Sequence, residues 1–352
     1  MKEAVVSSVT TVAIHDVPIP TPRADQVLIK VVFSGSNPKD WKVPLWRTLD
    51  HNSGDDIAGI VEAVGENVVE FKKGDRVAAF HEMLAPHGSF AEYAIAFAST
   101  TFHLPKKTSF EEGSTIPLAA MTAALALYFR LGLPEPWKEA TASPTPLIVY
   151  GGSSAVGAFA IKLARLSNIH PIIAISGRGQ AYVEGLIDRS KGDTIIDYRI
   201  GDEGIVSGIK EALKKASTNE VHYALDAISE HNSYQNICQV LSKQGSKITT
   251  VMPIKDFSVP DGIANSWTMV GAVHEDVAPE SAGGKAGMKT GGKEFGHVFF
   301  RLFSRGLQEG WFTGHPYEVV PGGLNGVEKG LTDMKSGKNS ATKYIFRIED
   351  TK

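Results

Sequence analysis

Apolar and polar residues alternate over short stretches in the first third of the chain, and Pro and Gly interrupt the alternation. A period of two is typical of half-buried β-strands, and regularly spaced turn residues separate such strands. The pattern predicts strands at Ala4–Val6, Gln26–Phe33, Ile57–Val64, Arg76–Phe80 and Ser89–Ile95. We therefore expect residues 1–120 to form an irregular, barrel-like β domain.

From Pro146 the pattern changes to continuous apolar strands that alternate with helical segments. The predicted strands are Leu147–Tyr150, Pro171–Ser176, Thr194–Ile196, Tyr223–Asp226 and Lys247–Val251. The predicted helices between them are Ala155–Asn168, Gln180–Arg189, Ile205–Ala216 and Ser233–Leu241. Strands that alternate with helices in this way indicate a parallel, doubly wound α/β sheet.

Near the C-terminus the chain returns to the strand-and-turn pattern of the first domain, at Trp311–Val320 and in a final strand at Lys343–Ile348. We therefore expect the doubly wound domain, residues 124–310, to be inserted between two parts of the β domain, residues 1–123 and 311–352. The segment Ala278–Lys293 is rich in Gly, Ala and Lys, which predicts a mobile surface loop.

Composition and charge narrow the possible partners. The 352 residues carry 36 basic and 39 acidic side chains, a formal charge of −3, without a dense run of Lys or Arg, which argues against nucleic acid and anionic membranes as partners. The N-terminus lacks the apolar core of a signal peptide, and no apolar run reaches about 18 residues, so we expect a soluble, cytoplasmic protein. The only cysteine, Cys238, excludes an intramolecular disulfide, and we interpret it as a buried thiol.

A turn of small residues follows the first strand of the inserted domain, in the order strand, Gly151-Gly152-Ser153-Ser154-Ala155-Val156-Gly157, helix. Small residues let the backbone approach a pyrophosphate, and the N–H groups at a helix N-terminus bind it. A serine, Ser154, stands at the middle glycine of the usual GxGxxG motif, and it can supply a hydroxyl and an N–H. The turn therefore predicts a dinucleotide site, with a purely packing role as the alternative.

The end of the second strand of this domain indicates which dinucleotide binds. An acid about 20 residues after the glycines would bind a ribose 2′-hydroxyl and repel a 2′-phosphate. The strand ends Ala174-Ile175-Ser176-Gly177-Arg178-Gly179, without an acid. A hydroxyl and a guanidinium suit a phosphate dianion, so we predict NADPH, although Arg178 could also be a solvated loop charge.

The order and spacing of several short motifs resemble the medium-chain dehydrogenase/reductase superfamily along essentially the whole chain. They include Gln26-Val27-Leu28-Ile29-Lys30-Val31, Gly59-Ile60-Val61-Glu62-Ala63-Val64-Gly65, Gly74-Asp75-Arg76-Val77, Gly88-Ser89-Phe90-Ala91-Glu92-Tyr93, Ile196-Asp197-Tyr198 and Gly322-Gly323-Leu324-Asn325-Gly326-Val327. The resemblance implies a GroES-like catalytic domain, residues 1–123 and 311–352, and an NADPH-binding Rossmann domain, residues 124–310.

Within that superfamily the chain resembles the zinc-free quinone-oxidoreductase branch, and most closely the fungal group of trans-acting enoyl reductases and related yeast-type oxidoreductases. The residues that carry this resemblance are Ser36-Asn37-Pro38-Lys39-Asp40-Trp41-Lys42, the variant phosphate turn and Gly337-Lys338-Asn339-Ser340-Ala341-Thr342-Lys343. Zinc alcohol dehydrogenases of the superfamily take ligands from a cysteine in the segment matching Ser36-Asn37 and from a Gly-His-Glu motif. This chain has Gly54-Asp55-Asp56 at the second place and lacks both that cysteine and the four-cysteine lobe, so we predict no metal. We interpret His51, His81 and His87 as loop or surface residues.

The resemblance also implies a set of cofactor-binding residues. At the nicotinamide end it places Asn37, Pro38, Asp40 and Lys42, with Thr122 on the substrate side and Val251, Met252, Thr342 and Lys343 at the cofactor. At the pyrophosphate it places Gly152, Ser153, Ser154, Ala155 and Val156, and at the 2′-phosphate Ser176, Arg178 and Tyr198. Alternatives remain open. Asp40 and Lys42 could form a surface ion pair, and Tyr198 could be a strand-end aromatic. A packing role alone is possible for Thr122, Val251, Met252, Thr342 and Lys343.

These features predict a zinc-independent oxidoreductase that transfers a hydride from NADPH to an activated C=C bond, in an enone or enoyl group, or to a quinone. A conjugated oxygen spreads the developing charge, so positioning supplies most of the catalysis. Asp40, Lys42 and Thr122 are the candidate catalytic residues. The alternatives are an NADPH-dependent aldehyde or carbonyl reductase and a non-catalytic NADPH-binding sensor. The partner is a small-molecule substrate, and the chain is either a monomer or a homodimer.

Overall fold

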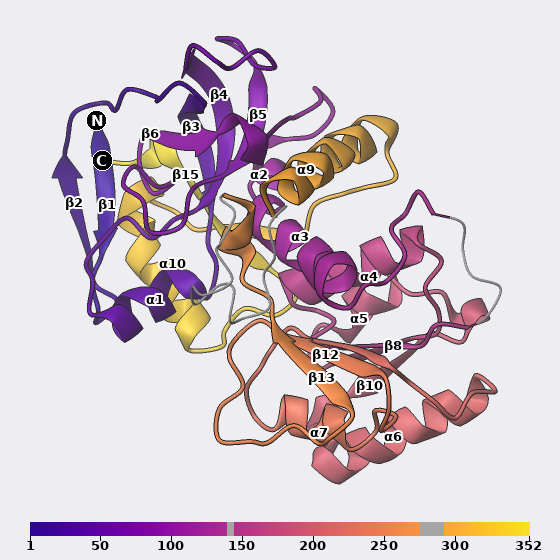
Figure 1. The fold of residues 1–352 in the computed structure, drawn as a ribbon. Coiled ribbons are helices and arrows are strands. Elements are labelled where there is room, and N and C mark those ends of the chain that lie inside the picture. The colour runs from indigo at the N-terminus through magenta and orange to yellow at the C-terminus, as the bar shows by residue number, and fades with distance from the viewer. Residues whose placement is uncertain (139–143, 275–291) are drawn as a thin grey trace. The chain divides into compact units, whose positions relative to one another are not determined.

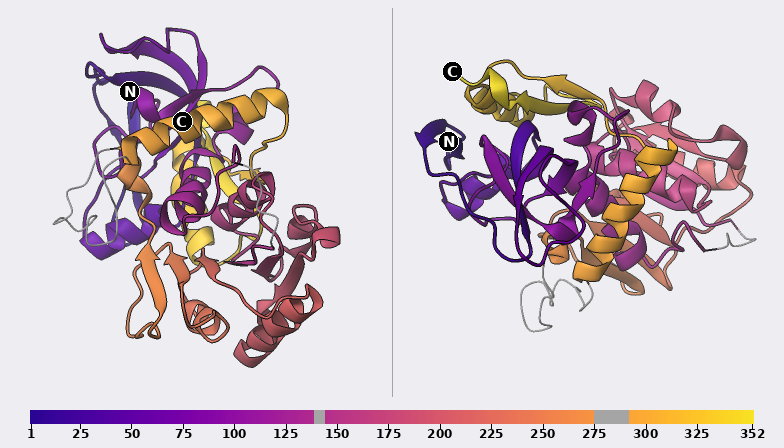
Figure 2. Two further views of the ribbon diagram at one scale, coloured as in Figure 1. Left: turned by 45° about the vertical axis from the view of Figure 1, so that its right-hand side comes forward. Right: turned by 90° about the horizontal axis from the view of Figure 1, so that it is seen from above.

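The computed structural model describes residues 1–138, 144–274 and 292–352, which divide into two compact units (Figure 1). Unit 1 holds the described residues 1–121, 271–274 and 292–352, and unit 2 holds 122–138 and 144–270. The chain therefore leaves the first unit and returns to it, and both termini lie close together in unit 1 (Figures 1 and 2). Residues 278–291 of the expected surface loop lie outside the described residues.

Unit 1 is built on a mostly antiparallel sheet of order β14-β15-β3-β4-β5-β7, with β6 paired to β3, and a separate two-stranded sheet joins β1 to β2. Val27, Ile29 and Val31 of the central strand β3 belong to its apolar core, together with Phe90 and Phe346. The strands are β1 (Lys2–Val6), β2 (Val12–Asp16), β3 (Gln26–Gly35), β4 (Asp56–Val64), β5 (Arg76–Phe80), β6 (Tyr93–Phe97), β7 (Thr101–His103), β14 (Tyr317–Val319) and β15 (Lys343–Arg347).

Among the described residues, five α-helices accompany these strands. They are α1 (Lys39–Arg47), α2 (Phe110–Gly113), α3 (Pro117–Ala124), which crosses the boundary between the units, α9 (Gly292–Glu309) and α10 (Val327–Lys335). None of the helices among the described residues is both long and apolar enough to cross a membrane.

Helix α9 belongs to unit 1, whereas the sequence pattern placed residues up to 310 in the inserted domain. Aromatic packing holds it there: Phe300 stacks on Phe102 of β7 at 5.6 Å between ring centroids, and Phe303 stacks on Phe312 at 5.0 Å. The Arg301 guanidinium also donates to the carbonyls of residues 98, 99 and 101. Phe102 and the carbonyls of residues 98, 99 and 101 are remote from the helix in sequence, so the local pattern does not reveal where the helix packs.

Unit 2 is a parallel sheet of order β10-β9-β8-β11-β12-β13, the arrangement of a Rossmann fold, and it confirms the predicted fold class. Helices α4 and α5 cover one side of the sheet, and α6 and α7 cover the other (Figure 1). The strands are β8 (Leu147–Tyr150), β9 (Ile172–Ser176), β10 (Thr194–Asp197), β11 (Tyr223–Asp226), β12 (Ser246–Thr250) and β13 (Ile263–Trp267). The helices are a π-helix at Leu125–Arg130, α4 (Ala155–Leu166), α5 (Gln180–Glu184), α6 (Asp202–Lys215) and α7 (Ser233–Cys238).

Several elements differ from the predicted bounds. The strand expected at Ser89–Ile95 begins only at Tyr93, because the N–H groups of Ser89 and Phe90 bond to Gly54 and to the Asn52 side chain. Helix α5 ends at Glu184, which is five residues before the predicted end at Arg189, and Gly185 follows it. The sequence pattern also missed β2 and β13, edge strands in which most side chains are exposed or half-buried and alternation is weak.

Candidate functional site

The predicted phosphate turn lies at the carboxyl end of β8, where α4 begins. Ser154 is the N-cap of α4: its Oγ accepts the Gly157 N–H at 3.1 Å, and its own N–H donates to Gly151 at 2.8 Å. A β-carbon on Gly157 would lie 2.2 Å from the Gly151 carbonyl oxygen, so only glycine permits this close turn. The N–H groups of Ala155 and Val156 lie in the first turn, where the helix itself supplies no acceptor.

At the end of β9, the hydroxyl oxygen of Ser176 is buried and has no hydrogen-bond partner among the described residues. Arg178 follows on an exposed position, and the Tyr198 ring lies against Gly177, where a β-carbon would come within 2.3 Å of it. The three residues predicted around the 2′-phosphate therefore come from two neighbouring segments at the carboxyl edge of the sheet. The unpaired buried hydroxyl fits a ligand that supplies its missing hydrogen bond.

One carboxylate stands beside this group and bears on its electrostatics. Asp197 at the end of β10 lies opposite Ser176 in the strand register. Its Oδ1 accepts from the Arg199 Nε at 2.8 Å, and its Oδ2 pairs with the Arg199 Nη2 at 2.5 Å. Hydrogen bonds from Arg199 lower the pKa of Asp197 to about 2. The negative charge next to Ser176 is thus already matched by a guanidinium.

Asp226 at the end of β11 is a residue that sequence reasoning missed as part of the site. Its Oδ1 accepts from the backbone of Ile228 at 3.0 Å and Ser229 at 2.8 Å, and Ser233 donates to Oδ2 at 2.5 Å. The Ser229 hydroxyl oxygen in turn accepts from the N–H groups of Val251 and Met252. The predicted cofactor residues Val251 and Met252 are therefore tied to the strand on which Asp226 lies. An acid that ends a buried strand next to the phosphate-turn strand was the available signal.

Burial also perturbs two titratable groups near this edge. Desolvation raises the pKa of Asp226 to about 6, although its hydrogen bonds from Ser233, Ser229 and Ile228 oppose the shift. Desolvation, with a contribution from Asp226, raises the pKa of Cys238 to about 11. Cys238 is a buried free thiol, as predicted, and its thiolate is scarce at neutral pH.

In unit 1, the segment around Asn37 forms a buried polar cluster with β4 and β15. The Lys343 ammonium contacts Asp56 Oδ2 at 2.5 Å and the Asn37 Oδ1 at 3.1 Å, and the Asn37 side-chain amide donates to the same Asp56 oxygen at 2.8 Å. The other Asp56 oxygen accepts the Leu118 N–H at 2.7 Å. The predicted cofactor residues Asn37 and Lys343 are thus bonded to each other, and the buried ammonium of Lys343 serves this cluster.

A second buried cluster surrounds Lys39, which the sequence did not single out. Its ammonium pairs with Asp40 Oδ1 at 3.0 Å and with Asp55 Oδ2, and it donates to the Ser53 carbonyl. The other Asp55 oxygen lies 3.0 Å from His81 Nδ1, and His81 Nε2 lies 3.0 Å from the Pro86 carbonyl oxygen. His81 lies in the loop after β5, one of the two expected places, but it is buried and not at the surface. The signal in the sequence was the adjacent pair Lys39-Asp40 with a second acid, Asp55, further along the chain.

Burial and charge set the ionisation of this cluster. Burial alone would lower the pKa of Lys39, but the carboxylates of Asp40 and Asp55 outweigh it and raise the pKa. Burial, together with the neighbouring charge of Asp55, raises the pKa of Asp40 to about 7 despite Lys39. Burial works against the charged form of Asp55 too, yet Lys39 and His81 hold its pKa below the ordinary value. At neutral pH, Asp55 is therefore the carboxylate that Lys39 principally neutralises.

The remaining predicted residues have varied surroundings. Asp40 is fully buried and pairs with Lys39, so it does not form the alternative surface ion pair with Lys42. The Lys42 ammonium lies over the Trp41 ring, 5.4 Å from its centroid. Pro38 is exposed, and the Thr342 hydroxyl donates to the Ser340 carbonyl at 3.1 Å. Thr122 is buried at the first position of unit 2.

Among the described residues, no group of three or more His, Cys, Asp or Glu side chains is arranged to hold a metal ion. Asp55 and Asp56, at the place of Gly-His-Glu, pair with the ammonium groups of Lys39 and Lys343. Lysine ammonium groups of the chain therefore form ion pairs with the carboxylates at this position.

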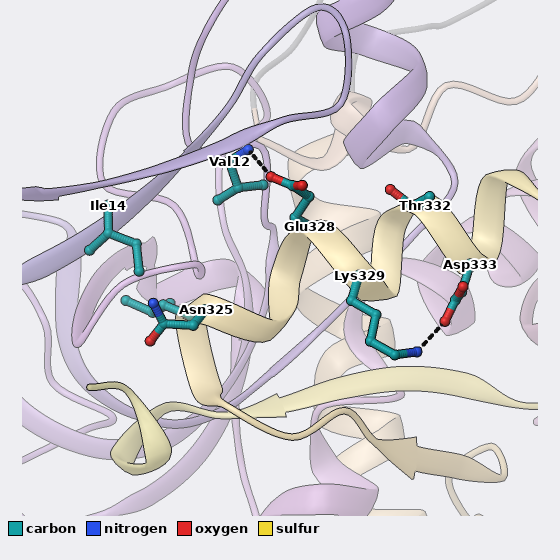
Figure 3. A pocket seen from close by; sticks show the side chains of 8 residues that line it. Val12, Ile14, Asn325, Glu328, Lys329, Thr332 and Asp333 are labelled. Atoms are coloured by element: carbon teal, nitrogen blue, oxygen red, sulfur yellow. Dashed lines mark hydrogen bonds and ion pairs between the residues drawn. The ribbon is translucent and has the colours of Figure 1, made fainter.

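A groove of about 580 Å³ lies elsewhere in unit 1, between β2 and α10 (Figure 3). Glu328 accepts the Val12 N–H at 2.9 Å, and Lys329 pairs with Asp333 along the helix. These interactions satisfy the charged side chains within the helix and the neighbouring strand. None of the predicted site residues lines this groove.

Comparison with known proteins agrees with this architecture. The model of the alcohol dehydrogenase GroES-like domain matches residues 23–106. Trans-enoyl reductase fsr4 of Gibberella fujikuroi is 48% identical over 330 residues, which cover 93% of this chain and 92% of fsr4.

Solved structures share the whole fold. An alcohol dehydrogenase superfamily protein from Novosphingobium aromaticivorans superimposes with a TM-score of 0.77 at 20% identity, over 99% of each chain. The CurK enoyl reductase gives a TM-score of 0.74 at 16% identity, over 98% of each chain. At these identities the likeness concerns the fold alone.

Proposed function

The chain belongs to the medium-chain dehydrogenase/reductase superfamily, in the family of the trans-enoyl reductases, and from this membership we propose that it transfers a hydride from NADPH to an activated C=C bond. The substrate class is a small conjugated carbonyl compound, an enone or enoyl group, with quinones as related acceptors. The name of the relative fsr4 supports the enoyl class. The bound nicotinamide supplies the hydride.

The observation that carries the choice of NADPH is the buried Ser176 hydroxyl, which lacks a partner among the described residues at the end of β9. A 2′-phosphate would accept its hydrogen bond, and the exposed Arg178 guanidinium next in the loop would pair with the charge. The nearest acid along the sheet edge, Asp197, is already neutralised by Arg199. Tyr198, packed against Gly177, would form the side of this phosphate site.

The rest of the Rossmann edge would hold the remainder of the dinucleotide. The N–H groups of Ala155 and Val156 would donate to the pyrophosphate, and Ser153 and Gly152 leave room for its approach. The loop tied by Ser229 would present Val251 and Met252 to the cofactor. The chain's part in the reaction is then to fix these groups at the carboxyl ends of β8, β9, β11 and β12.

Zinc-independent chemistry is part of the proposal. The segment Ser36-Asn37 and the residue Asp55 stand where alcohol dehydrogenases have zinc ligands, and the side chains of Asn37 and Asp55 are engaged in internal hydrogen bonds or ion pairs. A conjugated acceptor suits such a site, because the charge that develops after hydride transfer spreads onto the substrate oxygen and needs no metal.

Turnover of the purified full chain tests the proposal. We expect the enzyme to oxidise NADPH with an enone or a quinone as acceptor. The kcat/KM should be higher with NADPH than with NADH, and higher with the enone or quinone than with a simple aldehyde. A better rate with the aldehyde would indicate a carbonyl reductase, and binding of NADPH without any turnover would indicate a sensor. A preference for NADH would contradict the cofactor assignment.

Arg178→Ala tests the phosphate contact directly. We expect NADPH affinity to fall by roughly 1–3 kcal/mol, the scale of a charged hydrogen bond, with NADH affinity nearly unchanged. Arg189→Ala is the matched control, since Arg189 is a partly exposed arginine of the same unit that pairs with Glu184. Equal losses for both cofactors would show that Arg178 acts structurally.

A further inference from the structure

Lys39 joins two segments of unit 1 that are separate in the sequence. It is the first residue of α1, and its ammonium reaches Asp55 and the Ser53 carbonyl in the segment that precedes β4. Asp40, the next residue of α1, pairs with the same ammonium at 3.0 Å, and the Asp40 carbonyl accepts the Ser53 hydroxyl at 2.8 Å. The side chains of Asp40 and Asp55 are almost wholly buried, with 0% and 1% exposed, and that of Lys39 is 18% exposed.

We propose that the Lys39 ammonium is an internal cation of unit 1, beside the separate pair of Lys343 with Asp56, and that it neutralises Asp55 and holds the N-terminus of α1 in position. Lys39 acts as a positioning residue. It does not need to contact the substrate, because the residues it arranges are the ones predicted to face the cofactor.

The hydrogen bonds from the cluster show how the position of Lys39 is transmitted. Asp40 Oδ2 accepts the Asn37 N–H at 2.7 Å, which fixes the backbone immediately before α1. The Asn37 side chain then bonds to Asp56 and Lys343. The Lys39 ammonium therefore contacts Asp40 directly and reaches the Asn37 backbone through it, while Asp56 and Lys343 hold the Asn37 side chain.

The Lys39 ammonium lies beside the segments that match the metal-ligand motifs of zinc dehydrogenases. Asp55 occupies the place of the histidine in the Gly-His-Glu motif of zinc dehydrogenases, and Asn37 lies in the segment that matches their cysteine. A positive charge between α1 and the segment before β4 is thus supplied by a side chain of this protein. Two carboxylates and a carbonyl oxygen surround it, an all-oxygen environment that suits an ammonium ion.

Electrostatics predicts what removal of the ammonium does. Removing one partner of a buried ion pair leaves an uncompensated charge, which destabilises strongly, whereas removing both charges is much less harmful. Lys39→Met keeps the apolar stem and removes only the charge. Lys39→Met combined with Asp55→Asn removes the ammonium together with the carboxylate that it principally neutralises, and it keeps an oxygen toward His81. Asp40 remains, and its carboxyl, with a pKa already raised to about 7, becomes protonated more readily without Lys39.

The experiment compares these two variants with wild type and with Lys72→Met, a control in which the lost ammonium belongs to an exposed pair with Asp75. The readouts are the midpoint of thermal unfolding and, well below that midpoint, kcat and KM with an enone. We expect the midpoint of Lys39→Met to fall by about 10 °C. The double variant should recover most of this loss, and Lys72→Met should match wild type.

The kinetic readout separates positioning from mere stability. We expect the kcat of the stable double variant to remain lower than that of wild type by about tenfold or more, with KM little changed. Misplaced groups at a reacting centre have this effect. A double variant with wild-type kcat would overturn the positioning role. A Lys39→Met variant as stable as Lys72→Met would overturn the internal-cation role.

The kinetic part rests on the proposed function, whereas the unfolding comparison does not. If wild type reduces none of the enones, quinones and aldehydes, the proposed function fails. The midpoints of the single and double variants still decide whether Lys39 neutralises Asp55.

Discussion

The ring of Tyr198 lies so close to Gly177 that a β-carbon there would approach the ring to 2.3 Å. Gly177→Ala must therefore displace Tyr198 from the end of β9, the edge at which we place the 2′-phosphate. We expect NADPH affinity to fall about tenfold or more, with a smaller effect on NADH, measured by titration of the two cofactors under the same conditions.

Gly185→Ala is the matched control for this substitution. Gly185 has ordinary helical backbone angles, and a β-carbon there would meet only the Tyr182 carbonyl oxygen at 3.5 Å. Cofactor binding should not change in this variant. If Gly177→Ala also left the NADPH affinity unchanged, Tyr198 would have no part in phosphate recognition.

Ser176→Ala removes a hydroxyl that is buried and lacks a partner among the described residues. Loss of such a group should leave the free energy of unfolding unchanged or slightly higher, while NADPH affinity falls about tenfold. Ser154→Ala is the informative contrast, because it removes the N-cap of α4 and should destabilise the fold by about 1 kcal/mol. Chemical denaturation and cofactor titration of both variants check this, and a large loss of stability in Ser176→Ala would reveal a structural role.

The raised pKa of Asp226 makes stability depend on pH. Because the folded protein holds this proton up to a pH of about 6, against a reference value of 3.8, the stabilising contribution is fully present below 3.8 and is lost as the pH rises through about 6. We expect wild type to lose roughly 2–3 kcal/mol more than Asp226→Asn between pH values of about 4 and about 7.

Comparison with Asp226→Asn removes the contributions that other groups make in the same range. Asp40 titrates with a pKa of about 7, and burial lowers the pKa of His274 to about 4, so both affect the wild-type curve. They are present in both proteins and cancel in the difference. Denaturant unfolding of both proteins across this pH range provides the measurement, and parallel stability curves would contradict the assigned pKa.

Substitutions at the three candidate catalytic residues test whether positioning supplies most of the rate. We expect Asp40→Asn, Lys42→Met and Thr122→Ala each to lower kcat moderately with an enone, and none to abolish it. Loss of a true proton donor would instead lower kcat by about 10²–10⁴ and change its pH profile. Profiles of kcat against pH, with an enone and an aldehyde in parallel, distinguish the two outcomes.

Local patterns were sufficient for most of the Rossmann unit. Strand, small-residue turn and helix follow one another from Leu147, and each is a short-range feature that period and composition reveal. The doubly wound sheet then follows from general rules of connection, which place the ends of its parallel strands at one edge. Ser176 and Arg178 could be named as candidates because the residues after the second strand have a known place in such a sheet.

Long-range interactions decided the rest, and the sequence alone did not reveal them. The segment from Gly292 to Glu309 is an amphipathic helix that joins unit 1 through partners such as Phe102, nearly 200 residues away. That pairing depends on packing between distant surfaces. A periodicity of 3.6 shows which side of a helix is apolar but not which surface covers it.

The sequence by itself determined the fold class, the family and the order of strand, small-residue turn and helix at residues 147–166, because these depend on local pattern and on motifs in a fixed order. Only the tertiary structure decided that Lys39 pairs with Asp55, that Lys343 pairs with Asp56 and that Asp226 anchors the loop at Ser229. A buried charge must find its partner wherever the fold places one, so the identity of that partner depends on three-dimensional proximity and not on spacing along the chain.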